Sequence, residues 1–132
     1  MTCARRTIPP LAAALALLSG TALAQDDVNP EEAQLAYNNH CRTCHTTKEG
    51  DNRLGPSLHG VIGREAGSAP GFGYSSAMQD AGITWDEETL DRYIENPEAV
   101  VPGNNMKPYS GITDPEERAK IIAHLKAESG GQ

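Results

Sequence analysis

The sequence has few of the residues that usually fill a hydrophobic core. Aromatic residues make up 5% of its 132 positions, with one tryptophan and one phenylalanine, and the hydrophobic share is 38%. A chain of this size also buries only part of its surface when it folds. Side chains alone therefore supply little core, and we expect a bound apolar group to complete it.

Basic residues are scarce relative to acidic ones. The chain has 11 lysines and arginines against 18 aspartates and glutamates, which gives a formal net charge of −7 at pH 7. Proteins that bind nucleic acid or anionic lipid carry positive charge on the binding face. We therefore expect no nucleic-acid partner and a solvated, acidic surface.

Long apolar runs are absent. The run at 11–18 is too short to span a bilayer, so no stable membrane insertion is expected. It follows two arginines and precedes Ala22-Leu23-Ala24, which is the pattern of a cleaved secretory signal. We expect a signal peptide at 1–24 and a single domain at 25–132. An uncleaved anchor is the alternative.

Cysteine is rare as well, and two of the three cysteines are separated by only two residues. Cys3 lies in the segment expected to be removed, so no disulfide is available to the domain. The other two form Cys41-Arg42-Thr43-Cys44-His45, the C-x-x-C-H pattern of covalent haem c attachment. Thiols at this spacing add to the two vinyl groups at one haem edge, and the adjacent imidazole binds the iron. We expect one haem c, attached through Cys41 and Cys44 and ligated by His45.

Two other kinds of site use a C-x-x-C pair. A structural zinc site needs four ligands, which here would have to include histidines, and no pair of histidines follows the two cysteines at the spacing of a zinc finger. A thioredoxin-like site lies in a βαβ context, which the sequence does not predict. A zinc-binding module stays as an alternative to haem.

Capping signals predict three helices. The first begins at Asn29-Pro30 and runs into Cys41. The second begins with a capping box at Thr84 and ends before Pro97. The third begins at 113–116 and ends at 130–131. The apolar faces are Leu90, Tyr93 and Ile94 in the second and Ile121, Ile122 and Leu125 in the third. The glycine-rich stretch between the first two predicts loops that a haem would organise.

Several ordered motifs resemble class I cytochrome c, the soluble monohaem family of mitochondrial and bacterial electron carriers. The resemblance runs from about residue 31 to residue 125. Its motifs are Cys41–His45, Gly55-Pro-Ser-Leu-His-Gly60, Gly63-Arg64, Ala69-Pro-Gly-Phe72, Gly82-Ile-Thr-Trp85, Asn96-Pro97 and Val101-Pro-Gly-Asn-Asn-Met106. It implies an all-α fold in which three main helices and loops wrap around one covalently bound haem.

The resemblance also implies both axial ligands of the iron. Once 1–24 is removed, Met78 and Met106 are the only methionines, and Met106 stands where the family places its sixth ligand. Met78 is interpreted as a core gap filler. Pro56 matches the residue whose carbonyl accepts the N–H of the proximal imidazole, here His45. The other histidines, His40, His59 and His124, are not expected to bind iron.

Further contacts with the haem are implied position by position. Arg64, Tyr74 and Trp85 match donors to the propionates, and Tyr93 matches a tyrosine that hydrogen-bonds the axial sulfur. Trp85 and Tyr93 also fit simple core packing. The residues matched to haem packing are Leu58 and Leu90. Ala33 matches a small residue at the crossing of the first and last helices, near His124.

The resemblance implies an electron carrier and no enzyme. We expect a bacterial periplasmic monomer that exchanges electrons with a quinol-oxidising complex, a terminal oxidase, a reductase or a dehydrogenase. The alternatives are a haem peroxidase or gas sensor with an open sixth position, and a redox subunit docked permanently on a larger enzyme. Mitochondrial members surround the haem edge with lysines, which are few here. The partner's docking patch is therefore expected to be neutral or basic, or the contact mainly apolar.

Overall fold

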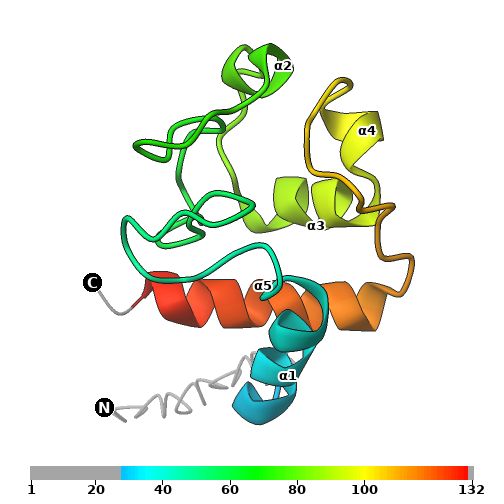
Figure 1. Ribbon diagram of the computed structural model, residues 1–132. Coiled ribbons are helices and arrows are strands. Elements are labelled where there is room, and N and C mark those ends of the chain that lie inside the picture. Colours follow the sequence, from blue (N-terminus) through cyan, green and yellow to red (C-terminus); the bar gives the residue numbers. More distant parts are fainter. Residues whose placement is uncertain (1–27, 131–132) are drawn as a thin grey trace, which may run out of the picture.

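The computed structural model describes residues 28–130, which form five helices and no strand. They are α1 (Pro30–His40), α2 (Ser76–Gln79), α3 (Glu87–Glu95), α4 (Pro97–Val100) and α5 (Pro115–Ser129). In Figure 1, α1 crosses in front of α5, α3 lies above them, and long loops cover one side. The expected all-α class is confirmed. The expected signal peptide at 1–24 lies outside the described residues.

Helices α1 and α5 each begin at a side-chain cap that the sequence predicts. Asn29 caps α1 by accepting the Glu31 N–H at 2.8 Å, and Asp114 caps α5 by accepting the Glu116 N–H at 2.9 Å. A proline follows each cap, where its missing N–H costs no helical hydrogen bond. Both starts are as predicted.

The predicted capping box at Thr84 is wrong. Asp86 is the cap of α3, and its carboxylate accepts the Thr89 N–H at 2.7 Å. Residues 84 and 85 are extended instead, because their backbone pairs with an earlier loop. Thr84 forms an isolated bridge with Glu65, and the Trp85 N–H donates to the Arg64 carbonyl at 2.9 Å. This pairing fixes Trp85 in the core before the helix begins.

Small residues allow α1 and α5 to approach each other. Ala33 and Ala36 on α1 are buried, and so is Ile121 on α5. The Tyr37 ring lies 4.6 Å from the His124 ring, centroid to centroid, across the same contact. The expected roles of Ala33 at the crossing and of His124 beside the first helix agree with this packing.

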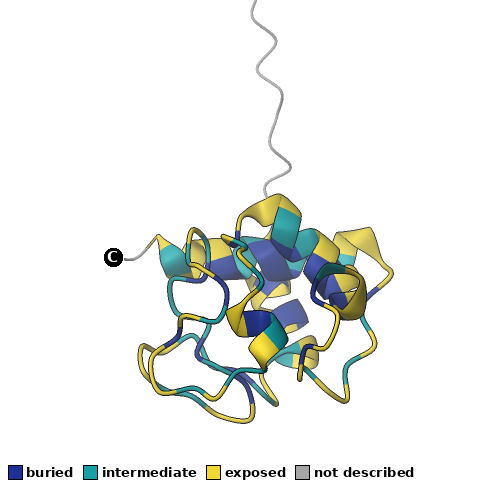
Figure 2. Ribbon diagram, turned by 90° about the horizontal axis from the view of Figure 1, so that it is seen from above, coloured by how far each residue is buried: buried dark blue, intermediate teal, exposed yellow. Residues whose placement is uncertain are grey.

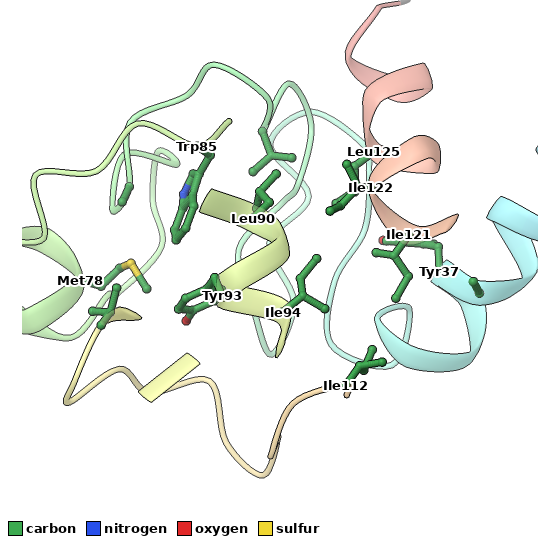
Figure 3. Packing of buried hydrophobic residues seen from close by; sticks show 14 residues of the cluster. Tyr37, Met78, Trp85, Leu90, Tyr93, Ile94, Ile112, Ile121, Ile122 and Leu125 are labelled. Atoms are coloured by element: carbon green, nitrogen blue, oxygen red, sulfur yellow. The ribbon is translucent and has the colours of Figure 1, made fainter. Parts of the chain in front are cut away.

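The core joins these helices to the loops. Figure 3 shows Met78, Trp85 and Tyr93 on one side of α3 and Ile121, Ile122 and Leu125 on the other. All six are buried, and the apolar faces predicted for α3 and α5 are correct. Figure 2 shows the buried residues along the inner sides of the helices, with exposed residues around the rim. Each buried aliphatic side chain contributes about 1.5–3 kcal/mol.

A buried arginine closes the fold between α3 and α5. Arg118, which is 6% exposed, donates to the Asp91 carboxylate at 2.7 Å and to the Ile112 and Thr113 carbonyls at 3.0 Å each. The hydrogen bond with Asp91 raises the pKa of Arg118. The Ile112 N–H in turn donates to the Ile94 carbonyl at 3.0 Å. The chain between α4 and α5 is thereby fixed against the end of α3.

Gly111 lets this chain pass close to α3, and its replacement gives a direct test. Its φ is +103°, and an added Cβ would lie 1.9 Å from the Glu95 carbonyl oxygen. We expect Gly111→Ala to lower the free energy of unfolding by more than about 3 kcal/mol, because the backbones must separate. Guanidinium unfolding of the haem-loaded protein measures this.

The matched control for this change is Gly50→Ala. Gly50 has a φ of +69°, but nothing lies within 4 Å of an added Cβ. Gly50→Ala should lower the free energy of unfolding by only about 1 kcal/mol, because alanine has to adopt the left-handed conformation of Gly50. Equal losses of stability for the two variants would show that the close approach to Glu95 is unimportant.

Candidate haem site

The C-x-x-C-H motif forms a turn at the end of α1. The Cys41 N–H donates to the Tyr37 carbonyl at 2.8 Å, as the last bond of the helix. The N–H groups of Cys44 and His45 then both donate to the Cys41 carbonyl, at 3.1 and 3.0 Å. The Tyr37 hydroxyl donates to the His45 carbonyl at 3.1 Å. The two half-buried thiols and the imidazole therefore come from one tightly wound turn.

The imidazole of His45 is buried and oriented by one hydrogen bond. Its Nδ1 lies 2.8 Å from the carbonyl oxygen of Pro56, which is the contact expected of Pro56. A carbonyl only accepts, so Nδ1 carries the proton and Nε2 keeps its lone pair. Burial lowers the pKa of His45 from its ordinary value, and the Pro56 carbonyl opposes this shift. A neutral ring with a free Nε2 is the form that binds a metal.

Gly55 lies against the ring and leaves no room for a side chain. A Cβ at this position would lie 2.3 Å from Cε1 and 2.8 Å from Nε2 of His45. The Gly55 N–H donates to the Cys44 carbonyl at 2.8 Å, which holds the loop in place. The loop therefore supports the ring from its side while Pro56 fixes the ring nitrogen.

Asn52 and Ser57, whose contacts were not predicted, hold Pro56 in position. The Ser57 N–H donates to the Asn52 side-chain oxygen at 2.9 Å, and the Ser57 hydroxyl donates to the Lys48 carbonyl at 2.5 Å. The Asn52 amide nitrogen donates to the Pro70 carbonyl at 2.9 Å. Asn52 thus ties the Pro56 loop to the long glycine-rich loop. Polar loop residues have no periodicity, so no sequence signal identifies these partners.

Arg64 offers the clearest sign of a missing anionic group. Its Nη atoms donate to the His59 carbonyl at 2.7 Å and the Ser57 carbonyl at 2.9 Å. Its Nε is buried, with no acceptor among residues 28–130. Burial also lowers the pKa of Arg64. A buried donor atom without a partner is costly unless an anion accepts from it. A haem propionate has this chemistry, so the site fits haem c.

The other residues matched to haem contacts lie around the same core. Tyr74 and Leu58 are half-buried against it, and the Tyr74 hydroxyl accepts the Ala69 N–H at 3.1 Å. Leu90 and Tyr93 are buried on α3. The Trp85 ring lies 5.0 Å from the Tyr93 ring, centroid to centroid (Figure 3). The packing of Trp85 and Tyr93 in the core is compatible with the contacts with the haem that are expected of them.

Tyr93 keeps its hydroxyl proton in this environment. Burial is the main cause that raises its pKa to about 12, and the charge of Glu98 adds to it. The phenol is therefore a hydrogen-bond donor at neutral pH, as its expected partnership with an axial sulfur requires.

Met106 lies in a loop that a buried asparagine shapes. The Met106 N–H donates to the Asn104 side-chain oxygen at 3.0 Å, which forms an Asx turn. The Asn104 amide nitrogen donates to Glu98 at 3.1 Å and to the Val101 carbonyl at 3.0 Å. The role of Asn104 was not predicted, although an asparagine two residues before the methionine is a typical Asx-turn signal. Met78 lies buried in the core cluster, which suits a gap filler.

The alternatives for the cysteine pair find no support in the described residues. No group of three or more His, Cys, Asp or Glu side chains in residues 28–130 is placed to hold a metal ion. Burial, with a smaller effect of Cys44, raises the pKa of the Cys41 thiol to about 12. Reactive redox cysteines have depressed pKa values.

The remaining histidines have other partners. His40 is exposed and lies 3.5 Å from the Glu117 carboxylate, measured from Nε2 to Oε2. The His59 Nδ1 lies 3.2 Å from the Thr47 carbonyl oxygen. His124 packs against Tyr37. These contacts agree with the expectation that none of the three binds iron.

Gly55→Ala tests whether the ring of His45 depends on the loop beside it. The new methyl group would push the imidazole away from Pro56, and we expect the free energy of unfolding to fall by about 3 kcal/mol. The measurement is guanidinium unfolding of the haem-loaded protein, followed by haem absorbance. Gly73→Ala is the control, since nothing lies within 4 Å of its added Cβ. Unchanged stability in Gly55→Ala would contradict this view of the site.

The family of this chain is shown by its similarity to known proteins. The family model for cytochrome c matches residues 30–128. Cytochrome c2 of Rhodomicrobium vannielii is 49% identical over 94 residues, which cover 68% of this chain and 72% of the relative. Cytochrome c2 of Rhodopila globiformis is 45% identical over 98 residues, covering 74% and 92%.

A solved structure shows the same fold. Cytochrome cH from Methylobacterium extorquens superimposes with a TM-score of 0.68 at 36% sequence identity, covering 75% of this chain and 98% of that structure. The family match spans the C-x-x-C-H turn, the Pro56 loop, Arg64 and the Met106 loop in one continuous segment. The chain therefore belongs to the cytochrome c family.

Proposed function

We propose that this chain is a periplasmic one-electron carrier whose haem iron is ligated by His45 and Met106. Family membership establishes the coarser part: the chain binds one haem c covalently through Cys41 and Cys44 and transfers electrons without acting as an enzyme. The observation that carries the finer proposal is the buried His45 ring, held by Pro56 at 2.8 Å with Nε2 left free.

The haem supplies the exchange between Fe(II) and Fe(III) when it is bound. The chain's own residues supply a fixed environment for it. Pro56 keeps the proton on Nδ1 of His45, so the ligand nitrogen does not change its protonation state. Arg64 offers a buried donor to a carboxylate. Because these groups are already in place, little has to move when an electron arrives or leaves.

Met106 would close the sixth position of the iron. A thioether ligand opposite a histidine raises the reduction potential, which suits a respiratory carrier. The Asx turn at Asn104 positions the backbone of Met106 before any ligand bond forms. A closed position also excludes oxygen and peroxide, which separates the carrier from the peroxidase and sensor alternatives.

We expect residues 1–24 to direct export of the protein to the periplasm. A secretory signal followed by a motif for covalent haem attachment indicates export to the periplasm. Removal of the signal leaves a domain at 25–132. No helix among the described residues is long and apolar enough to cross a membrane. The partners are redox proteins, and the classes proposed are a quinol-oxidising complex, a terminal oxidase, a reductase and a dehydrogenase. The chain works as a monomer.

Carbon monoxide distinguishes a closed from an open iron site. We expect the ferrous wild-type spectrum to be low-spin and unchanged by CO, and the ferric form to show an iron–sulfur charge-transfer band. Met106→Ala should lose that band and bind CO. Met78→Leu, a substitution of similar volume in the core, should keep both properties and cost less than about 1.5 kcal/mol of stability.

The opposite pattern would overturn the ligand assignment. If the wild type binds CO rapidly, the sixth position is open and the peroxidase or sensor alternative takes first place. If Met78→Leu rather than Met106→Ala loses the band, Met78 is the ligand.

The intact mass of the exported protein tests the signal. We expect a single species that begins at Gln25 and carries the mass of one haem, recovered in the periplasmic fraction. Expression with the haem-maturation machinery and gentle release of the periplasm provide the sample. A mass that includes residues 1–24, together with recovery in the membrane fraction, would mean an uncleaved anchor.

A further inference from the structure

The loop that carries Met106 is tied to α4 by one carboxylate. Glu98, in the first turn of α4, accepts the Gly103 N–H on Oε1 at 3.0 Å and the Asn104 amide nitrogen on Oε2 at 3.1 Å. Each oxygen of the carboxylate therefore bonds one residue of the loop. Figure 1 shows this loop as the gold stretch of chain beside α4.

These bonds continue to the methionine through a buried side chain. Asn104 is 2% exposed, and its side-chain oxygen accepts the Met106 N–H at 3.0 Å. Its amide nitrogen is shared between Glu98 and the Val101 carbonyl, which lies 3.0 Å away. The nitrogen only donates and the oxygen only accepts, so one orientation of the amide satisfies both ends. By holding the nitrogen, Glu98 helps to keep the oxygen directed at Met106.

Helix α4 connects the same carboxylate to the core. Asn96 ends α3 and caps α4 by accepting the Ala99 N–H at 3.2 Å, and Pro97 at the start of α4 is buried. The support of Glu98 is therefore fixed to the helix that carries Tyr93. The charge of Glu98 adds to the effect of burial in raising the pKa of Tyr93 to about 12. Glu98 thus acts both on the loop and on the tyrosine that is expected to bond the axial sulfur.

The two hydrogen bonds, rather than an ion pair, are what hold the loop. Lys107 lies 3.9 Å from Glu98, with side chains 68% and 57% exposed, so this ion pair contributes little. Hydrogen bonds to a carboxylate are about twice as strong as neutral ones. Glu98 and Asn104 also line a cleft of about 180 Å³, through which water can compete for the same groups. The attachment of the loop is therefore firm but reversible.

We infer that Glu98 is a positioning residue for Met106, and that its carboxylate keeps the sixth ligand on the iron by fastening the loop at Gly103 and Asn104. The inference rests on the proposed function, in which Met106 is that ligand, and adds to it the residue that holds the ligand in place. Without the carboxylate, both donors turn to water and the loop opens more often. An open loop admits small ligands that a closed loop excludes.

Imidazole measures how readily the loop opens, because it binds the ferric iron only when Met106 has left. We expect Glu98→Ala to raise the affinity of the ferric haem-loaded protein for imidazole about tenfold, since two hydrogen bonds to a charged group are lost. Glu98→Gln should raise it only about threefold, because the glutamine oxygen still accepts one of the two bonds. Loss of the iron–sulfur charge-transfer band during the titration gives the affinity.

Glu88→Ala is the matched control. Glu88 is an exposed glutamate in the first turn of α3, as Glu98 is in the first turn of α4, and it stands at the end of α3 that is remote from α4. Its substitution removes the same charge from the same kind of helix position, so the affinity for imidazole should stay within about twofold of the wild type. Gly50→Ala, which lowers stability through another loop, should also leave this affinity within about twofold.

Amide hydrogen exchange in the ferrous protein supplies a second readout, which needs no added ligand. The Gly103 N–H loses its acceptor in Glu98→Ala, and the Met106 N–H loses the support of Asn104. Both should exchange about tenfold faster than in the wild type, and neither should change in Glu88→Ala.

Two results would overturn the inference. They are an affinity for imidazole that is the same in Glu98→Ala and Glu88→Ala, and exchange of the Gly103 and Met106 amides that Glu98→Ala does not change. A ferric wild type without the iron–sulfur band would instead remove Met106 as the ligand, and would overturn the proposed function together with the inference. The band of the wild type therefore separates the two failures.

Discussion

The hydrogen bond between His45 and Pro56 is the contact on which the rest of the structure depends. It joins the turn at the end of α1 to the loop that follows, and it leaves one ring nitrogen available inside a buried site. Gly55 is required because the ring occupies the place of its side chain. Asn52 and Ser57 then fix the loop that presents the acceptor. Gly55, Pro56 and Ser57 therefore all act on the position of one imidazole.

The long loops have little regular structure because their polar groups are satisfied in another way. Arg64 bonds two loop carbonyls, and Asn52 links two loops through its single amide. Such bonds hold a chain around an object without pairing it into a sheet. The group that the loops enclose must have an apolar centre, because the chain has few aromatic side chains to fill its core. It must also carry an anion beside the buried Nε of Arg64. A haem with its propionates meets both requirements, which explains why a glycine-rich stretch is tolerated inside a small domain.

The sequence predicted the parts of the structure that depend on neighbours along the chain. The caps at Asn29 and Asp114 were predictable because a cap bonds an N–H two or three residues away. The cap at Thr84 was wrong because a distant backbone segment at Arg64 competed for the same residues. The single-turn helices α2 and α4 are too short to show a period. The pair of Arg118 and Asp91 spans 27 positions, and no local pattern reveals it.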